Sequence, residues 1–175
     1  MKTLHRLSLL ATLITTATFS SGAFAATVNG TASATALTPI TIIAGTALSF
    51  GSFATSAAAT AGTIMLTSGG TRTASGGTVL SAGGPGVVGT FTIGGSGNAT
   101  FAVTYPPAAT TLVGTTPGVT ALFGTTAGAG ATYGLGTAAL SGGAYTLNVG
   151  GILTVPAAVA AGSYTASYPV IVEYN

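Results

Sequence analysis

Apolar and polar residues alternate almost without error near the start of the chain, in the stretch ATVNGTASATALTPITI at residues 26–42. Even positions carry small or apolar residues, among them Val28, Gly30, Ala32 and Ala34, and the odd positions between them carry Thr, Ser or Asn. A period of two places the even residues on one face of a β-strand. Because these side chains are so small, such a strand buries little apolar surface by itself.

The same parity returns with bulky residues at the other end, in SYTASYPVIVEYN at residues 163–175. Ser163, Thr165 and Glu173 occupy odd, outward positions, and Pro169 indicates an edge or a bulge because it cannot donate to a ladder. The even positions are predicted to face the core, and the last of them is expected to bury its ring and hydrogen-bond through its hydroxyl. They are Tyr164, Tyr168, Val170, Val172 and Tyr174.

Between these ends, short runs rich in Val, Ile, Thr, Tyr and Phe are separated by Gly and Pro turns, and no stretch carries a convincing helical period. This spacing predicts an all-β domain, either a sandwich or a closed, rolled sheet. The predicted strands are Thr63–Thr67, Thr78–Ala82, Val87–Ile93, Ala99–Tyr105, Val119–Phe123, Ala144–Val149, Ile152–Val155 and Tyr164–Tyr174.

The first 25 residues have the features of a secretory signal peptide. Lys2 and Arg6 form a positive end, an apolar stretch follows, and Ala23-Phe24-Ala25 is a small-x-small cleavage site. The stretch is too short and too interrupted by threonine to span a bilayer stably. We therefore expect a secreted or cell-surface protein, exported through the periplasm, with no membrane span in its mature chain. The expected parts are a signal at 1–25, an N-terminal extension at 26–36 and a β-sandwich domain at 37–175.

Charge is nearly absent once the signal is removed. The whole sequence has 3 Lys and Arg, 1 acidic residue, 1 His and no Cys, and of the charged residues only Arg72 and Glu173 lie beyond the signal. Acid–base catalysis and nucleophile activation need titratable side chains, metals need His, Cys or carboxylates, and nucleic-acid binding needs several cations. We therefore expect no catalytic, metal or cofactor site and no nucleic-acid partner, and we interpret Arg72 and Glu173 as ordinary surface charges.

Several segments carry a resemblance to a known group of proteins. They are AGSYTASYPVIVEYN at the C-terminus, LTPITIIAGTALSFGSF, GGTVLSAGG, ATFAVTY and GGILTVPAAVAAGSY. Together they resemble a family of bacterial secreted domains similar to spore coat protein U and to archaic chaperone–usher pilins. Pilins of this kind often carry a disulfide, which this chain lacks because it has no cysteine.

The resemblance implies an incomplete immunoglobulin-like, pilin-type β-sandwich that a strand from a neighbouring copy completes by β-strand addition. The protein would then be a homopolymer subunit of an extracellular filament, assembled with a periplasmic chaperone and an outer-membrane usher. The donor face would be Val28, Gly30, Ala32 and Ala34, and the acceptor strand would carry the five bulky C-terminal residues.

Two alternatives stay open at this point. Residues 26–42 could be the first strand of their own sandwich, and the protein could be a secreted monomeric module that binds carbohydrate or a surface through scattered tyrosines.

The scarcity of ionisable groups makes a prediction about solution conditions. Stability depends on pH only through groups whose pKa differs between the folded and unfolded states. Reference carboxylate pKa values lie near 4 and tyrosine near 10, so melting of the chain from Ala26 onward should change little between about pH 4 and 9. A melting series across that range, repeated at several salt concentrations, checks this. A steep change in midpoint would contradict the interpretation of both charges.

Overall fold

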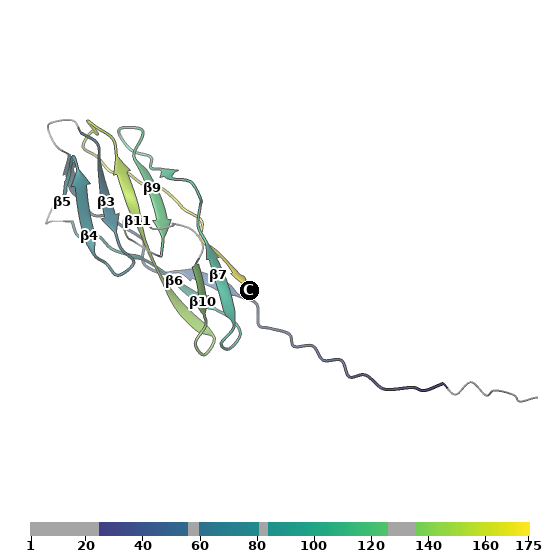
Figure 1. Ribbon diagram of the computed structural model, residues 1–175. Helices are drawn as coiled ribbons and strands as arrows, with labels where there is room; N and C mark the ends of the chain where they lie inside the picture. Colours follow the sequence, from purple (N-terminus) through teal and green to yellow (C-terminus); the bar gives the residue numbers. More distant parts are fainter. Residues whose placement is uncertain (1–24, 56–59, 81–83, 126–135) are drawn as a thin grey trace, which may run out of the picture. The chain divides into compact units, whose positions relative to one another are not determined.

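The computed structural model describes residues 25–55, 60–80, 84–125 and 136–175, and the predicted signal peptide lies outside them except for Ala25. These residues form strands and connecting segments without a helix, which confirms the all-β prediction (Figure 1). Contacts within the chain divide it into two units, between Thr35 and Ala36. The strands are β1 (Thr41–Ala44), β2 (Phe53–Thr55), β3 (Gly62–Leu66), β4 (Arg72–Gly76), β5 (Thr78–Leu80), β6 (Gly89–Gly94), β7 (Thr100–Thr104), β8 (Thr110–Thr111), β9 (Thr120–Gly124), β10 (Gly136–Ala139), β11 (Ala144–Val155) and β12 (Ile171–Tyr174).

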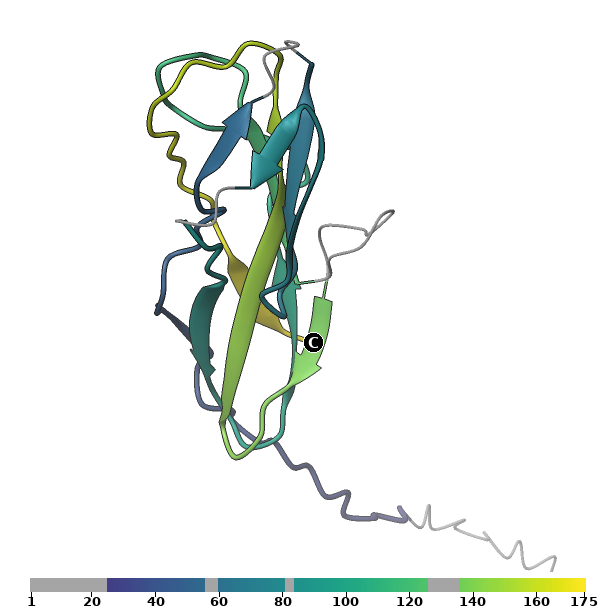
Figure 2. The same cartoon turned by 90° about the vertical axis from the view of Figure 1, so that its left-hand side faces the viewer.

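The longest strand, β11, organises the larger sheet. Its first half, 144–149, pairs antiparallel with β6, and its second half pairs with both β3 and β9. The sheet order is β1-β6-β11-β3-β4, with β9 also on β11 and β8 on β9. Figure 2 shows β11 running the length of the domain, so one strand belongs to both halves of this sheet.

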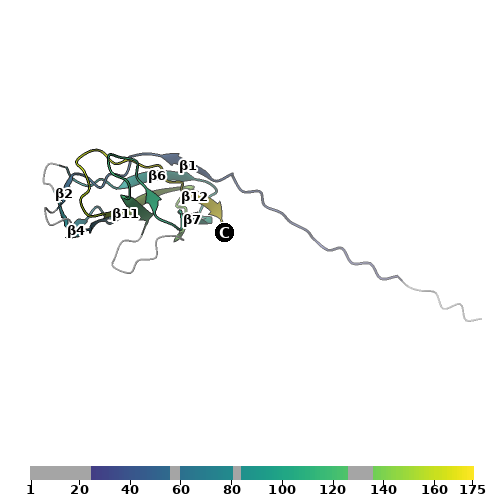
Figure 3. The ribbon, with the colours of Figure 1, turned by 90° about the horizontal axis from the view of Figure 1, so that it is seen from above.

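A second, three-stranded sheet has the order β10-β7-β12, and β2 and β5 form a separate pair. Seen from above in Figure 3, β1 and β6 lie in one layer and β7 and β12 in the other. Phe101 of β7 meets Tyr145 of β11 edge-to-face with ring centroids 5.3 Å apart. The two sheets therefore pack face to face as a sandwich-like arrangement, with aromatic contacts between the layers.

One contiguous hydrophobic core fills the space between the layers. Its fully buried members alternate along the strands, as with Ile64 and Leu66 on β3, or Phe101 and Val103 on β7. This alternation is the period of two that the sequence displays. Half-buried side chains from both ends of the chain, including Ile40, Ile42, Val172 and Tyr174, pack against this core.

The prediction of two strands at 144–149 and 152–155 is wrong, because β11 continues through Gly150 and Gly151. Both glycines are buried between neighbouring strands. A Cβ at Gly150 would collide with the Leu66 carbonyl oxygen, and one at Gly151 with the Leu122 carbonyl oxygen. The glycine pair is therefore required by the close approach of backbone on both sides, and it does not mark a turn.

The two patterned ends of the chain form shorter strands than predicted. From the first stretch only β1 is a strand, and from Tyr164–Tyr174 only Ile171–Tyr174 is a strand. The predicted strand Tyr164–Tyr174 is interrupted at Pro169, which has no N–H to donate to a neighbouring strand. The predicted Thr78–Ala82 strand is β5 up to Leu80, and its remainder lies outside the described residues.

Arg72 is not the ordinary surface charge expected from its Gly-rich surroundings. It is the first residue of β4 and is half-buried. Its guanidinium donates hydrogen bonds to the carbonyl oxygens of Gly84 (2.6 Å) and Ser52, while its buried Nε has no partner among the described residues. Desolvation lowers the pKa of Arg72. Arg72 therefore holds two connecting segments against the edge strand β4.

Replacing Arg72 by Met should lower the free energy of unfolding by about 1.5–3 kcal/mol, because it removes hydrogen bonds from a charged donor. Arg72→Lys should retain only part of the stability that Arg72 contributes, since an ammonium lacks the planar fork that reaches both carbonyls. Urea denaturation measures the difference. The matched control is Thr73→Ala, at the exposed neighbouring position of the same strand. Equal stabilities of Arg72→Met and Thr73→Ala would contradict this role.

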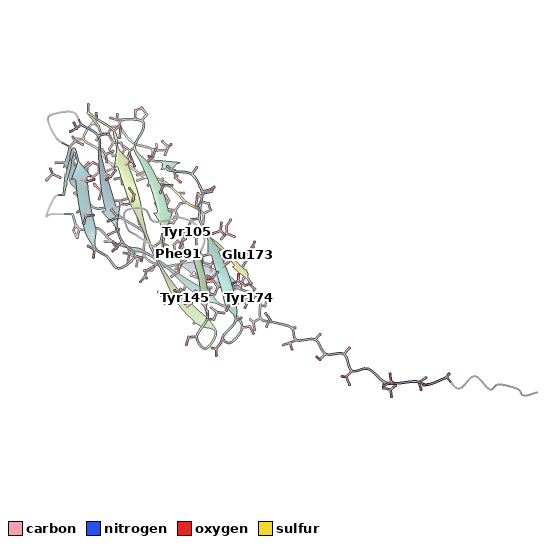
Figure 4. The ribbon with its side chains drawn as sticks, viewed as in Figure 1. Phe91, Tyr105, Tyr145, Glu173 and Tyr174 are labelled. Atoms are coloured by element: carbon pink, nitrogen blue, oxygen red, sulfur yellow. The ribbon has the colours of Figure 1, made fainter. Side chains whose placement is uncertain are left out.

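Tyr105 follows β7 and is 3% exposed (Figure 4). The Thr125 side chain lies near enough to favour the ionised form of Tyr105. The Tyr105 hydroxyl nevertheless has no hydrogen bond of good geometry within the described residues. Burial dominates and raises the pKa of Tyr105 well above its ordinary value. A group whose pKa is raised by folding stabilises the folded state fully at pH values below its pKa in the unfolded chain. This stabilisation is lost as the pH rises from that value through the pKa of the group in the folded protein.

The protein should therefore lose stability above about pH 10, where tyrosines of the unfolded chain ionise. Tyr105→Phe should move this alkaline loss to higher pH, as followed by melting between pH 8 and 12. The control is Tyr164→Phe, because hydrogen bonding to Thr115 lowers the pKa of Tyr164, which is the opposite direction. An unchanged alkaline limb in Tyr105→Phe would contradict the assignment.

Candidate functional site

Two strands at the margins of the two sheets define the most distinctive surface of the domain. Strand β1 ends the order of the larger sheet and pairs with β6, and β12 ends the order of the smaller sheet and pairs with β7. Within the described residues, each therefore presents one backbone edge that no other strand pairs. Unpaired edges expose N–H and C=O groups that readily accept another strand.

A groove begins at Ala44, the last residue of β1, and runs between the segment that follows β1 and the segment that precedes β12. Its wider part, about 920 Å³, lies between residues 48–55 on one wall and residues 159–168 on the other. A narrower part, about 290 Å³, lies between Ala44–Leu48 and Ala166–Tyr168. Leu48, Ala166 and Tyr168 line both parts, so we treat them as one groove.

The floor of the groove is aromatic. The ring of Tyr168 stacks on Phe123 with centroids 4.0 Å apart and an interplanar angle of 14°. It also meets Phe91 edge-to-face at 6.3 Å. Burial raises the pKa of Tyr168. A ring held on two sides by other aromatic rings is rigid, so it limits how large a side chain can sit above it.

Tyr164 lies in the wall at the wide part of the groove. Its hydroxyl donates to the carbonyl oxygen of Ala160 at 2.7 Å and lies 2.9 Å from the Thr115 hydroxyl oxygen. Thr165 forms a backbone bridge to Val113 in both directions. These bonds fix the segment before β12 in an extended path, although it forms no regular strand there.

At the opposite end, Tyr174 joins three segments of the chain. Its hydroxyl accepts a hydrogen bond from the Ser96 N–H and donates one to the Thr38 carbonyl oxygen, each at 2.7 Å. A Cβ at Gly95 would collide with this hydroxyl, which explains the glycine there. We call this arrangement the clasp. It bridges the end of β12 to the segment that enters β1.

Of the five residues predicted for the acceptor strand, Tyr164 and Tyr168 line the groove, and Val170, Val172 and Tyr174 do not. Tyr164, Tyr168, Val170, Val172 and Tyr174 are all half-buried and pack against the core. Ile171, in the opposite parity, is 50% exposed, and its neighbour Glu173 on β12 is exposed as well (Figure 4). The alternation of the sequence therefore persists through Pro169 even though the ladder does not.

The residues predicted for the donor face lie in the other unit. Val28, Gly30, Ala32 and Ala34 are all exposed, and Val28 is 94% exposed. None of residues 25–40 belongs to a strand. We call residues 26–36 the arm.

The opposite wall of the groove was missed by sequence reasoning. It contains Leu48, Phe50 and Phe53, with Phe50 buried and the other two half-buried. Their spacing in LSFGSF is the signal that could have indicated a segment lying along the core. Gly51, which has a φ of +73°, interrupts the alternation and conceals it.

Arg72 is charged and donates hydrogen bonds to the carbonyl oxygens of Ser52 and Gly84, two residues that line the wide part of the groove. The described residues hold no group of three or more His, Cys, Asp or Glu side chains that could bind a metal ion. No helix with the length and hydrophobicity needed to span a bilayer is found in the part of the chain that the structure describes.

Comparison with known proteins identifies the domain but not its activity. Neither a curated protein nor a solved structure matches the sequence. A family model described as a domain of unknown function, DUF4402, matches residues 40–174, which spans the strands β1 to β12 and both walls of the groove. The chain therefore belongs to the DUF4402 family.

Proposed function

We propose that this protein is a non-enzymatic structural subunit of an extracellular filament, and that copies join by inserting the arm of one into the groove of the next. The observation that carries this proposal is the groove itself, which begins at Ala44 on the edge strand β1 and is lined by Tyr164 and Tyr168 from the segment that precedes β12. A strand inserted there would pair with backbone on each side and cover the half-buried side chains.

The arm matches the C-terminal segment of the chain in length. Residues 26–36 and residues 164–174 are both eleven residues long, and each would span about 36 Å when extended. The two segments also share the same alternation. Small residues on the inner face of the arm would let its backbone approach a groove whose floor is already filled by Tyr168 and its aromatic partners.

Backbone hydrogen bonds would supply much of the binding energy. Burial of Val28 contributes about 1.5–3 kcal/mol, and each buried methyl about 0.8 kcal/mol. An inserted strand of this length forms on the order of ten backbone hydrogen bonds, each contributing about 0.5–1.5 kcal/mol net. The weak apolar face of the arm is therefore compatible with strong insertion.

The near-absence of charge suits such an assembly. Beyond the predicted signal only Arg72 and Glu173 are charged, so neighbouring copies hardly repel one another. Under this proposal the fold is an incomplete immunoglobulin-like, pilin-type sandwich. The protein is then secreted through the periplasm, where a chaperone would cover the groove before an outer-membrane usher passes the subunit on.

A carbohydrate-binding module is the second candidate, because tyrosines line the groove. Sugar rings stack on exposed aromatic faces, however, and the ring of Tyr168 is already stacked on Phe123. Negative-stain microscopy of surface material separates the two functions, since dispersed monomers would favour the module.

Ala32→Asp should abolish filaments and weaken the association of copies at least about 100-fold, because it places an unpaired carboxylate on the inserted face. The matched control is Ser33→Asp, which adds the same charge to the outward face one residue later and should leave filaments intact. Deletion of Thr27–Thr35 should likewise leave a soluble, β-rich domain that does not polymerise. Microscopy and sedimentation measure assembly, and normal filaments from Ala32→Asp or from the deletion would overturn the proposal.

A further inference from the structure

The clasp occupies the position where the arm joins its own domain. Thr38, whose carbonyl oxygen accepts the Tyr174 hydroxyl, lies two residues after the end of the arm. The same hydroxyl is fixed by the Ser96 N–H, so the first residues of the domain are tied to the end of β12. The clasp thus ties the start of the domain, where the arm is attached, to the end of β12.

The linker between the arm and β1 is poorly suited to a tight reversal. To lie in its own groove, the arm would have to turn back beside β1 as a hairpin. Tight hairpin turns need a positive φ at one or both central residues. Pro39 holds φ near −65°, and the residue before a proline is restricted to extended conformations, so neither Thr38 nor Pro39 fits such a turn. Neither residue has a positive φ in the structure.

The groove begins beyond the clasp, because its lining starts at Ala44 and includes neither Thr38 nor Tyr174. Its wide part is lined by residues 51–55 and 159–164, among others. A strand arriving from another molecule would not be tied to the clasp, whereas the protein's own arm is attached beside it.

We propose that the clasp and the Thr38-Pro39 linker form a device that prevents the arm from closing its own groove and so directs strand addition to a second copy. This inference rests on the proposed function. It assigns Tyr174 a positioning role in addition to its packing, because the hydroxyl holds the base of the arm while the ring packs on the core.

The test uses the chain from Ala26 onward and a variant in which the device is removed. Tyr174→Phe deletes the hydroxyl and keeps the ring, and Thr38→Asn with Pro39→Gly installs an Asn-Gly pair that favours a hairpin turn. Thermal unfolding is measured over a wide concentration range for the parent and for this triple variant. Each is also measured with Ala32→Asp added, which disables the arm.

In the parent, the melting temperature should rise by about 2–4 °C for each tenfold increase in concentration, because the arm stabilises another molecule. In the triple variant, the arm should raise the melting temperature already at the lowest concentration, with no further rise, and filaments should be lost. Ala32→Asp should remove the stabilisation in both. Tyr145→Phe, which removes a tyrosine hydroxyl on β11 outside the groove, is the matched control and should behave like the parent.

A concentration dependence in the triple variant equal to that of the parent would overturn the inference while leaving the proposed function intact. If Ala32→Asp changes nothing in the parent at any concentration, the proposed function fails and the inference fails with it. Thr38→Asn with Pro39→Gly, in a chain that keeps Tyr174, provides a second and milder variant. It should reduce the concentration dependence, and no reduction would also count against the inference.

Discussion

The antiparallel ladder of β11 is the interaction on which the rest of the structure depends. This strand carries β6 on its first half and both β3 and β9 on its second half. The larger sheet ends at β1 and at β4, and the smaller sheet that faces it ends at β10 and at β12. The groove begins at Ala44 on β1 and lies between residues 48–55 and residues 159–168. Gly150 and Gly151 allow the shared pairing along β11, since side chains there would push the flanking backbones apart.

Strands β1 and β12 each leave one backbone edge unpaired among the described residues, and half-buried apolar residues lie on β12 and just before it. Water can hydrogen-bond to backbone groups at an edge, but apolar side chains such as Val170 and Val172 stabilise the fold only as far as they are buried. Residues 26–36 are exposed and carry a matching alternation. Under the proposed function, strand addition between copies would satisfy both requirements together, and the clasp at Tyr174 would direct the covering strand to another molecule.

The scarcity of charge is a physical property of the whole domain and also a constraint on it. With hardly any ion pairs available, stability rests on packing and on backbone hydrogen bonds, and the few polar side chains that matter bind backbone groups. The guanidinium of Arg72 donates to two carbonyl oxygens. The hydroxyl of Tyr174 accepts from one N–H and donates to one carbonyl oxygen. A side chain used in this way joins segments that no strand pairing connects.

The sequence by itself determined the all-β class, the alternation of the C-terminal residues, and the scarcity of charge, with only Arg72 and Glu173 charged beyond residue 25. These follow from local rules, because a period of two and a composition are readable without knowing which segments meet. Only the tertiary structure decided that β11 is one strand, that Arg72 is a half-buried clamp, and that Leu48 and Phe53 form a wall opposite Tyr168. Tyr174 and Thr38 are 136 residues apart, so their hydrogen bond depends on the path of the whole chain between them. Contacts of that kind leave no local pattern, which is why the groove and its clasp could not be derived from the order of the residues.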